Sequence, residues 1–173
     1  MNYIKQLAGQ TVVYGMGIVL PRLLNYLLLT PFYTRQFSRA EYGVITELYA
    51  YVVFLIVILT YGMETGFFRF AEGGKKTENV YKTSLYSLLI TSVLFIGFIV
   101  FFKNSIASWL QYPEQSQYIL WLGIIVSLDA FTSIPFARIR YENNAKKYAA
   151  IRIIEVAVNI TANWFFIYYC DRN

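Results

Sequence analysis

The sequence predicts an all-α, polytopic membrane protein with about five transmembrane helices, forming a single transmembrane domain over residues 1–173. Hydrophobic residues make up 57% of the chain and charged residues only 14%, whereas a typical soluble domain carries about 25% charged residues. Aromatic residues reach 19%, and a soluble domain with this composition would expose large apolar patches. The apolar residues also occur in stretches of the length that crosses a bilayer core, about 20 residues.

Five such stretches follow one another along the chain, at residues 11–33, 43–63, 83–102, 118–136 and 153–169. The first is too long for a cleaved signal peptide and holds Pro and Arg at its centre. The third, SLYSLLITSVLFIGFIVFF, contains no charge. The fifth, IIEVAVNITANWFFIYY, carries polar residues along one side, so we expect it to cross the membrane only within a bundle that shields them.

The distribution of Lys and Arg predicts the orientation of the chain, because cytoplasmic loops carry an excess of these residues. With the N-terminus inside and the C-terminus outside, ten basic residues lie on the inner side and four on the outer side, with Arg22 counted in neither. Trp109, Trp121 and Trp164 then all fall toward the outer face, where indole rings prefer the headgroup level. The segment SIASWL is expected to lie flat along that outer interface.

Composition excludes several classes of function. The chain has no histidine and a single cysteine, Cys170, which removes His-ligated zinc and the Ser-His and Cys-His nucleophile pairs. It has no GxGxxG or GxxxxGK[ST] loop to hold a nucleotide. We therefore expect no enzyme activity, no metal and no cofactor. The net charge of +5 is better explained by basic loops that orient the chain than by nucleic-acid binding.

Arg22 is the leading candidate for substrate binding. It lies near the middle of the first span, where an Arg costs about 2.5 to 3.5 kcal/mol on translocon scales. Asn25 and Tyr26 follow at three and four positions and share its face. Pro21 removes a backbone donor and kinks the helix. We interpret this face as lining a wet cavity in which Arg22 meets an anion; the alternative is that Arg22 pairs with an acid on another helix and only locks the bundle.

Two further sets of polar residues are candidates. Asp129, Glu155 and Asn159 are candidates for ion or proton coupling, because an acid near a buried cation titrates at a shifted pH; interhelical hydrogen bonding is the alternative. Glu64 and Arg69 lie at the inner end of the second span and are candidates for gating or for an inner-side ion pair. Glu47, in the outer half of the same span, is ambiguous.

Three stretches together resemble the polysaccharide biosynthesis (O-antigen flippase-like) proteins of the multidrug/oligosaccharidyl-lipid/polysaccharide exporter superfamily. They are GQTVVYGMGIVLPRLLNYLLLTPFYTRQFSRAEYGVITELYAY at the start, YGMETGFFRFA at the end of the second span, and ARIRYENNAKKYAAIRI before the fifth. Their order and spacing match along essentially the whole chain.

The resemblance implies twelve to fourteen helices in two lobes, of which this chain is similar to part of the N-terminal lobe. It implies a transporter in the bacterial cytoplasmic (inner) membrane that flips undecaprenyl-pyrophosphate-linked oligosaccharide by alternating access, for lipopolysaccharide O-antigen or another surface polysaccharide. Arg22, with Asn25, would hold the pyrophosphate or acidic sugars. The implied partners are the lipid-linked oligosaccharide, membrane lipids and other polysaccharide assembly proteins.

The resemblance leaves alternatives open. Because five helices are fewer than twelve, we interpret the chain as the N-terminal portion of a longer flippase or as a truncated reading frame. Within the superfamily, a lipid II flippase or a cation-coupled drug exporter remains an alternative. Outside it, the alternative is a membrane scaffold subunit that packs helices without transporting anything, and a membrane enzyme comes third.

Overall fold

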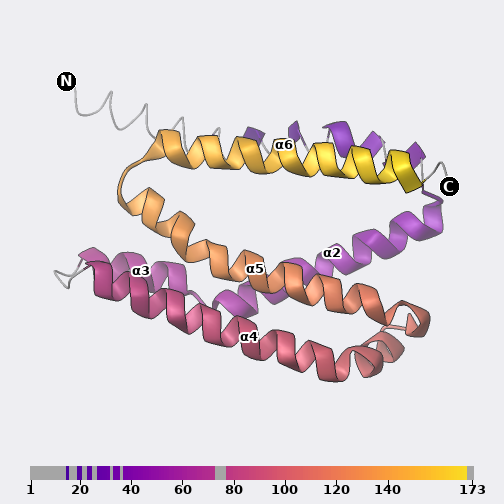
Figure 1. Cartoon of the computed structure of the whole chain (residues 1–173), viewed down its shortest axis with the longest axis horizontal. Coiled ribbons are helices and arrows are strands. Elements are labelled where there is room, and N and C mark those ends of the chain that lie inside the picture. Colours follow the sequence, from indigo (N-terminus) through magenta and orange to yellow (C-terminus); the bar gives the residue numbers. More distant parts are fainter. Residues whose placement is uncertain are drawn as a thin grey trace. The chain divides into compact units, whose positions relative to one another are not determined.

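The computed structural model describes residues 37–72 and 77–170, together with residues 15, 19–20, 23–24, 27–31 and 33–35. Of residues 40 and 167–170 it describes the backbone only. All regular elements in this part of the chain are helices (Figure 1). They are α2 (Arg39–Thr60), α3 (Met63–Glu72), α4 (Thr77–Trp109), the short 3-10 helix η1 (Pro113–Gln115), α5 (Ser116–Tyr141) and α6 (Ala145–Cys170).

Four helical stretches are long and apolar enough to cross a membrane: Glu41–Glu72, Thr77–Trp109, Pro113–Tyr141 and Ala145–Phe166. They contain the second to fourth predicted spans and all but the last residues of the fifth. The described residues of the predicted first span, 11–33, are helical as well. The prediction of an all-α, multi-pass membrane protein is therefore confirmed.

The helix boundaries follow from local chemistry. Ser38 caps the start of α2: its backbone N–H donates to Oε2 of Glu41 at 2.9 Å, and the N–H of Glu41 donates to the Ser38 hydroxyl at 3.3 Å. This reciprocal capping box satisfies two backbone donors that a helix start leaves open. At the start of α6, Asn144 accepts a hydrogen bond from the N–H of Lys147 in the same way.

Two helices end in left-handed residues that reverse the chain. Gln111 (φ 66°) follows α4, and the N–H of Tyr112 donates back to the carbonyl of Ala107 at 2.8 Å. Asn143 (φ 54°) follows α5, and the N–H of Asn144 donates to the carbonyl of Ile139 at 3.1 Å. Both arrangements satisfy carbonyls at the helix end that would otherwise lack a donor.

The second predicted span is broken near its inner end. Tyr61 and Gly62 both have positive φ angles, 34° and 70°, so α2 stops at Thr60 and α3 begins at Met63. The glycine permits this conformation without a Cβ penalty, and the Tyr61 hydroxyl lies 2.6 Å from Oγ of Ser87 on α4. The break lies at the end of the predicted span 43–63, and the whole stretch Glu41–Glu72 is long and apolar enough to cross a membrane.

The chain divides into two compact units, Thr46–Arg138 and the combination of Met1–Ile45 with Ile139–Asn173. In the unit Thr46–Arg138, α4 and α5 meet at small residues. The Ser92 hydroxyl donates to the backbone carbonyl of Ser127 at 3.2 Å, and the Ser127 hydroxyl donates to the carbonyl of Gly123 at 2.8 Å. Both serines are buried, and such small residues let two helices approach closely in a membrane.

Apolar side chains extend this contact in both directions. One cluster contains Val52 and Leu59 of α2 with Val126 and Ala130 of α5. A second, toward the end that the charge bias predicts to be outer, contains Ile99, Ala107 and Ile119, with Ile106 and Leu110 packed against it. The segment SIASWL therefore lies at the end of α4, where Ile106, Ala107 and Leu110 pack on the bundle, and its position along the outer interface stays a prediction.

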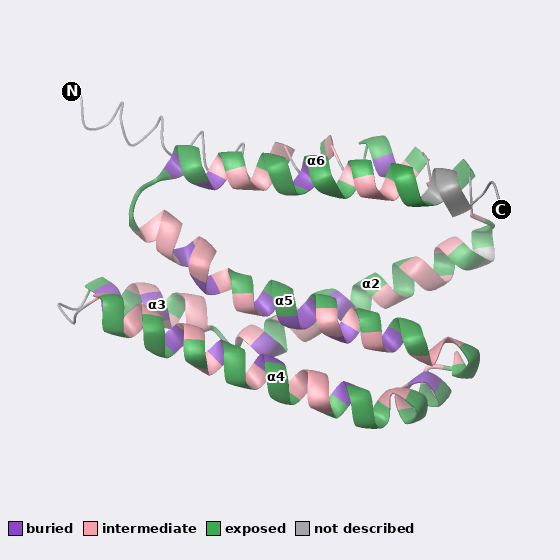
Figure 2. Ribbon diagram, viewed as in Figure 1, coloured by how far each residue is buried: buried purple, intermediate pink, exposed green. Residues whose placement is uncertain are grey.

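Many side chains in this unit are nonetheless exposed along every helix (Figure 2). In the apolar 18-residue segment of Pro113–Tyr141, the stretch that contains α5, 33% is buried. The corresponding shares are 17% for Thr77–Trp109, which is α4, and 11% for Glu41–Glu72. The helix α5 is therefore the central one in this unit. The exposed apolar faces of the others suit contact with lipid chains or with further helices.

The close approach of α4 and α5 makes a prediction about Gly123. A Cβ atom added there would lie 3.0 Å from Cγ1 and Cγ2 of Ile99. We expect Gly123→Ala to lower the free energy of unfolding by about 1 to 3 kcal/mol, the usual cost of overpacking, measured as thermal denaturation of the purified protein in detergent.

Gly97 of α4 provides the matched control, because a Cβ atom there meets nothing within 4 Å. Gly97→Ala should leave stability unchanged or raise it, since Ala favours helix over Gly. Adding Ile99→Ala should reduce the cost of Gly123→Ala. Equal effects of the two glycine substitutions would contradict the close packing.

Candidate functional site

The polar side chains on the described helices form three separate groups, one at the predicted outer end of the unit Thr46–Arg138, one at its predicted inner end, and one along α6. Each group joins residues that are distant in the sequence or one turn apart on a helix. Together they show partners of several of the described charged residues.

The outer group has a carboxylate at its centre. Glu47 lies near the start of α2, one turn before Tyr51, whose hydroxyl donates to Oε1 of Glu47 at 3.2 Å. Tyr112, in the connection after α4, donates to Oε2 at 2.9 Å. This bond to a negative acceptor raises the pKa of the Tyr112 hydroxyl above its usual value, because loss of the proton would place two anions side by side. Both carboxylate oxygens of Glu47 are thus held by tyrosines.

The inner group joins α4 to α5. Nη1 of Arg138 lies 3.0 Å from Oε2 of Glu78, and Nζ of Lys82 lies 3.5 Å from Oε1 of the same carboxylate. The Arg138 guanidinium also lies over the ring of Tyr81, 4.4 Å from its centroid. Cation–π contact and ion pairing act on the same guanidinium, so this group anchors the inner ends of the two helices.

The third group is the polar stripe predicted for the fifth span. Arg152 donates from Nη1 to Oε2 of Glu155 at 2.8 Å. Asn163 donates from Nδ2 to the carbonyl of Asn159 at 2.9 Å and lies 3.2 Å from its Oδ1. The Tyr33 hydroxyl donates to Oδ1 of Asn163 at 2.6 Å. The steps of three and four residues thus bring these side chains together, as the spacing indicated.

The three candidates for ion or proton coupling all lie in exposed positions: Asp129 on α5, and Glu155 and Asn159 on α6. The hydroxyls of Thr132 and Ser133, which share the face of Asp129, donate to the carbonyls of Asp129 and Ala130 within the helix. These bonds lie next to Pro135, which cannot donate to the helix. The coupling role of the three residues stays a prediction.

Glu64 and Arg69 lie in the first and last turns of α3. Five positions correspond to a rotation of about 140° around an α-helix, so the two side chains do not share one face. Glu64 is partly buried and Arg69 is exposed. The spacing therefore places Arg69 on another side of α3 than Glu64, and the gating role stays a prediction. Arg22, Asn25 and Tyr26 lie outside the described residues.

Sequence reasoning missed the partners of Glu47 and Glu78. Tyr112 is 65 positions from Glu47, and no periodicity relates residues in different elements. The aromatic richness of the chain was the available signal, because a tyrosine near a helix end is a ready donor to a carboxylate at the same depth. Within the described residues, no three His, Cys, Asp or Glu side chains come together in a way that could hold a metal ion.

These helices and contacts define a multi-pass α-helical membrane protein in which the ion pair of Glu78 with Arg138 joins two of the described helices. Residues 32–170 match the model of a family described as polysaccharide biosynthesis protein, and this match covers most of the chain. The chain belongs to the polysaccharide biosynthesis protein family, which confirms the resemblance at that level. Neither curated proteins nor solved structures gave a match. The matched range begins after Arg22, Asn25 and Tyr26.

The inner group makes a prediction about stability. We expect Glu78→Gln to lower the free energy of unfolding by about 0.2 to 1 kcal/mol, because partly exposed ion pairs contribute little. Arg138→Gln should cost more, since it also removes the contact with Tyr81. Denaturation of the two variants and of the double variant would measure the coupling between the residues.

Glu72→Gln is the control for the change in net charge, since Glu72 is likewise exposed and lies at the end of α3. It should leave stability unchanged. Strict additivity of Glu78→Gln and Arg138→Gln would show that the two side chains do not interact.

Proposed function

We propose that this chain is a transporter, or part of one, that flips an undecaprenyl-pyrophosphate-linked oligosaccharide across the bacterial cytoplasmic membrane for the synthesis of a surface polysaccharide such as the O-antigen of lipopolysaccharide. One combined observation carries the proposal: a member of the polysaccharide biosynthesis family has four helices of membrane-spanning length within the part of the chain that the structure describes. A helical membrane protein in such a process acts where a glycan must pass a bilayer.

The physical need for a protein at this step is large. Moving hydroxyl groups into hydrocarbon without hydrogen bonds costs several kcal/mol each, and a pyrophosphate costs more. Helices satisfy their own backbone groups in lipid, so a bundle can shield a polar path while its outer faces remain apolar. The exposed apolar side chains of α2, α4 and α6 suit that outer role.

In this proposal Arg22 provides the positive charge that binds the pyrophosphate of the substrate. A guanidinium offers paired donors that match phosphate oxygens, and Asn25 and Tyr26 supply neutral donors on the same face. Lobe rocking around this site would then expose it to one side of the membrane and afterwards to the other. Asp129, Glu155 and Asn159 are proposed to couple this motion to an ion, and Glu64 and Arg69 to stabilise the inner-closed state. We propose transport and no chemical catalysis.

The proposal is tested in cells that lack the gene and carry it back at its native length. Arg22→Ala should leave the amount of membrane-inserted protein unchanged and strongly reduce surface polysaccharide, because the phosphate ligand is lost. Arg22→Lys, which keeps the charge without the paired donors, should restore part of the export. Immunoblotting of membranes and gel analysis of the polysaccharide are the two measurements.

Arg39→Ala is the matched control, since Arg39 is an exposed arginine at the start of α2. It should change neither abundance nor export. Loss of abundance with Arg22→Ala would instead favour a bundle-locking role for Arg22, as in a scaffold subunit. Normal polysaccharide with sensitivity to cationic drugs would favour a drug exporter, and cell lysis with accumulated lipid II would favour a lipid II flippase.

A further inference from the structure

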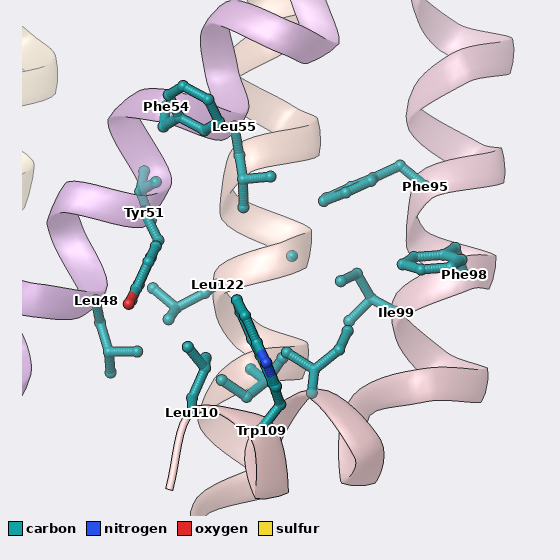
Figure 3. Close-up of a pocket in the computed structure, with 14 residues that line it drawn as sticks. Leu48, Tyr51, Phe54, Leu55, Phe95, Phe98, Ile99, Trp109, Leu110 and Leu122 are labelled. Atoms are coloured by element: carbon teal, nitrogen blue, oxygen red, sulfur yellow. The ribbon is translucent and has the colours of Figure 1, made fainter. Parts of the chain in front are cut away.

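A cavity of about 210 Å³ lies between α2, α4 and α5, at the end of the unit Thr46–Arg138 that is predicted to be outer. Figure 3 shows Tyr51 and Leu55 of α2 on one side of it and Phe95 and Phe98 of α4 on the other, with Leu122 of α5 between them. Gly123 of α5 and Ile99 of α4 also line it. None of the candidate residues that the structure describes lines this cavity.

The chemistry of the walls restricts the occupant. Apart from the tyrosine hydroxyl and the indole nitrogen, the lining side chains are hydrocarbon, from residues such as Leu48, Val52, Ile106 and Ile119. A water molecule in a cavity requires two to four polar partners, and a sugar requires more. The rim is open, because Phe54, Phe98 and Trp109 are strongly exposed. At membrane depth, an open apolar cavity of this kind suits a hydrocarbon chain of a lipid.

The edge of the cavity restricts the headgroup. Tyr51 is both a lining residue and a donor to Glu47, so the carboxylate lies directly beside the hydrocarbon space. Tyr112 holds its other oxygen. Among the described residues, no Lys or Arg forms an ion pair with Glu47, and two neutral hydroxyls leave its negative charge uncompensated. A carboxylate accepts about four hydrogen bonds, so room remains for a cationic donor.

We propose that the cavity binds one aminophospholipid of the outer leaflet, with a hydrocarbon chain between α2, α4 and α5 and its primary ammonium on Glu47. Apolar burial and charge complementarity then act on two ends of the same molecule. A quaternary ammonium has no N–H to donate, and an anionic headgroup would be repelled by Glu47. This inference is independent of what the protein transports.

The test uses quenching of Trp109, at the rim of the cavity, by lipids with brominated chains. The purified protein with Trp121→Phe and Trp164→Phe is placed in vesicles containing brominated phosphatidylethanolamine or brominated phosphatidylcholine at equal mole fractions. We expect stronger quenching by phosphatidylethanolamine. Glu47→Gln should reduce this preference about two- to fivefold, the range for one exposed charge pair. Leu55→Phe, which narrows the cavity, should weaken quenching by both lipids.

Two controls separate the cavity from the bulk bilayer. A variant that keeps only Trp121, an exposed residue of α5 outside the cavity lining, should be quenched equally by both lipids. Glu114→Gln removes another carboxylate at the same end, in η1, and should keep the preference. Equal quenching of Trp109 by the two lipids, or a preference that survives Glu47→Gln, would overturn the proposal. Protection of Trp109 from both lipids, with cross-linking of two copies at this face, would show that a second copy fills the cavity.

Discussion

The close approach of α4 and α5 is the constraint on which the described bundle depends. Between helices in a membrane there is little hydrophobic driving force, because lipid chains are as apolar as the side chains they replace. Stability must come from packing and from hydrogen bonds that only a short distance permits. Ser92, Ser127 and Gly123 provide that distance, and the α2 side chains then pack onto α5. The ion pair of Arg138 with Glu78 adds a polar contact between α5 and α4 at the predicted inner end.

The same approach shapes the cavity at the other end. Gly123 and Ile99 approach closely, and both also line the cavity, together with larger side chains such as Phe95 and Phe98. The end of α4 folds over this space through Ile106 and Leu110. A tight contact therefore sets both the rigidity of the unit and the position of its open apolar space.

Hydropathy was sufficient to predict the membrane spans, because the length of an apolar stretch is a property of neighbouring residues alone. It did not predict the break at Tyr61 and Gly62, since two left-handed residues interrupt a helix without changing its hydropathy. The step of three residues places Arg152 and Glu155 on one side of the helix, where they form an ion pair, whereas Arg138 and Glu78 are 60 positions apart and belong to different helices. Pairing across helices depends on packing, which a single sequence does not encode locally.

The ion pairs of Arg138 and Arg152 bear on where an anionic substrate could bind. The guanidinium of Arg138 is bonded to a carboxylate and covered by an aromatic ring, and that of Arg152 is bonded to Glu155. A phosphate at either site would have to displace a carboxylate that already holds the guanidinium. The carboxylates of Glu78 and Glu155 therefore compete with a phosphate for these two arginines. Because both of these arginines already have carboxylate partners, we keep the proposed anion site at Arg22, in the span for which the sequence predicts a kink.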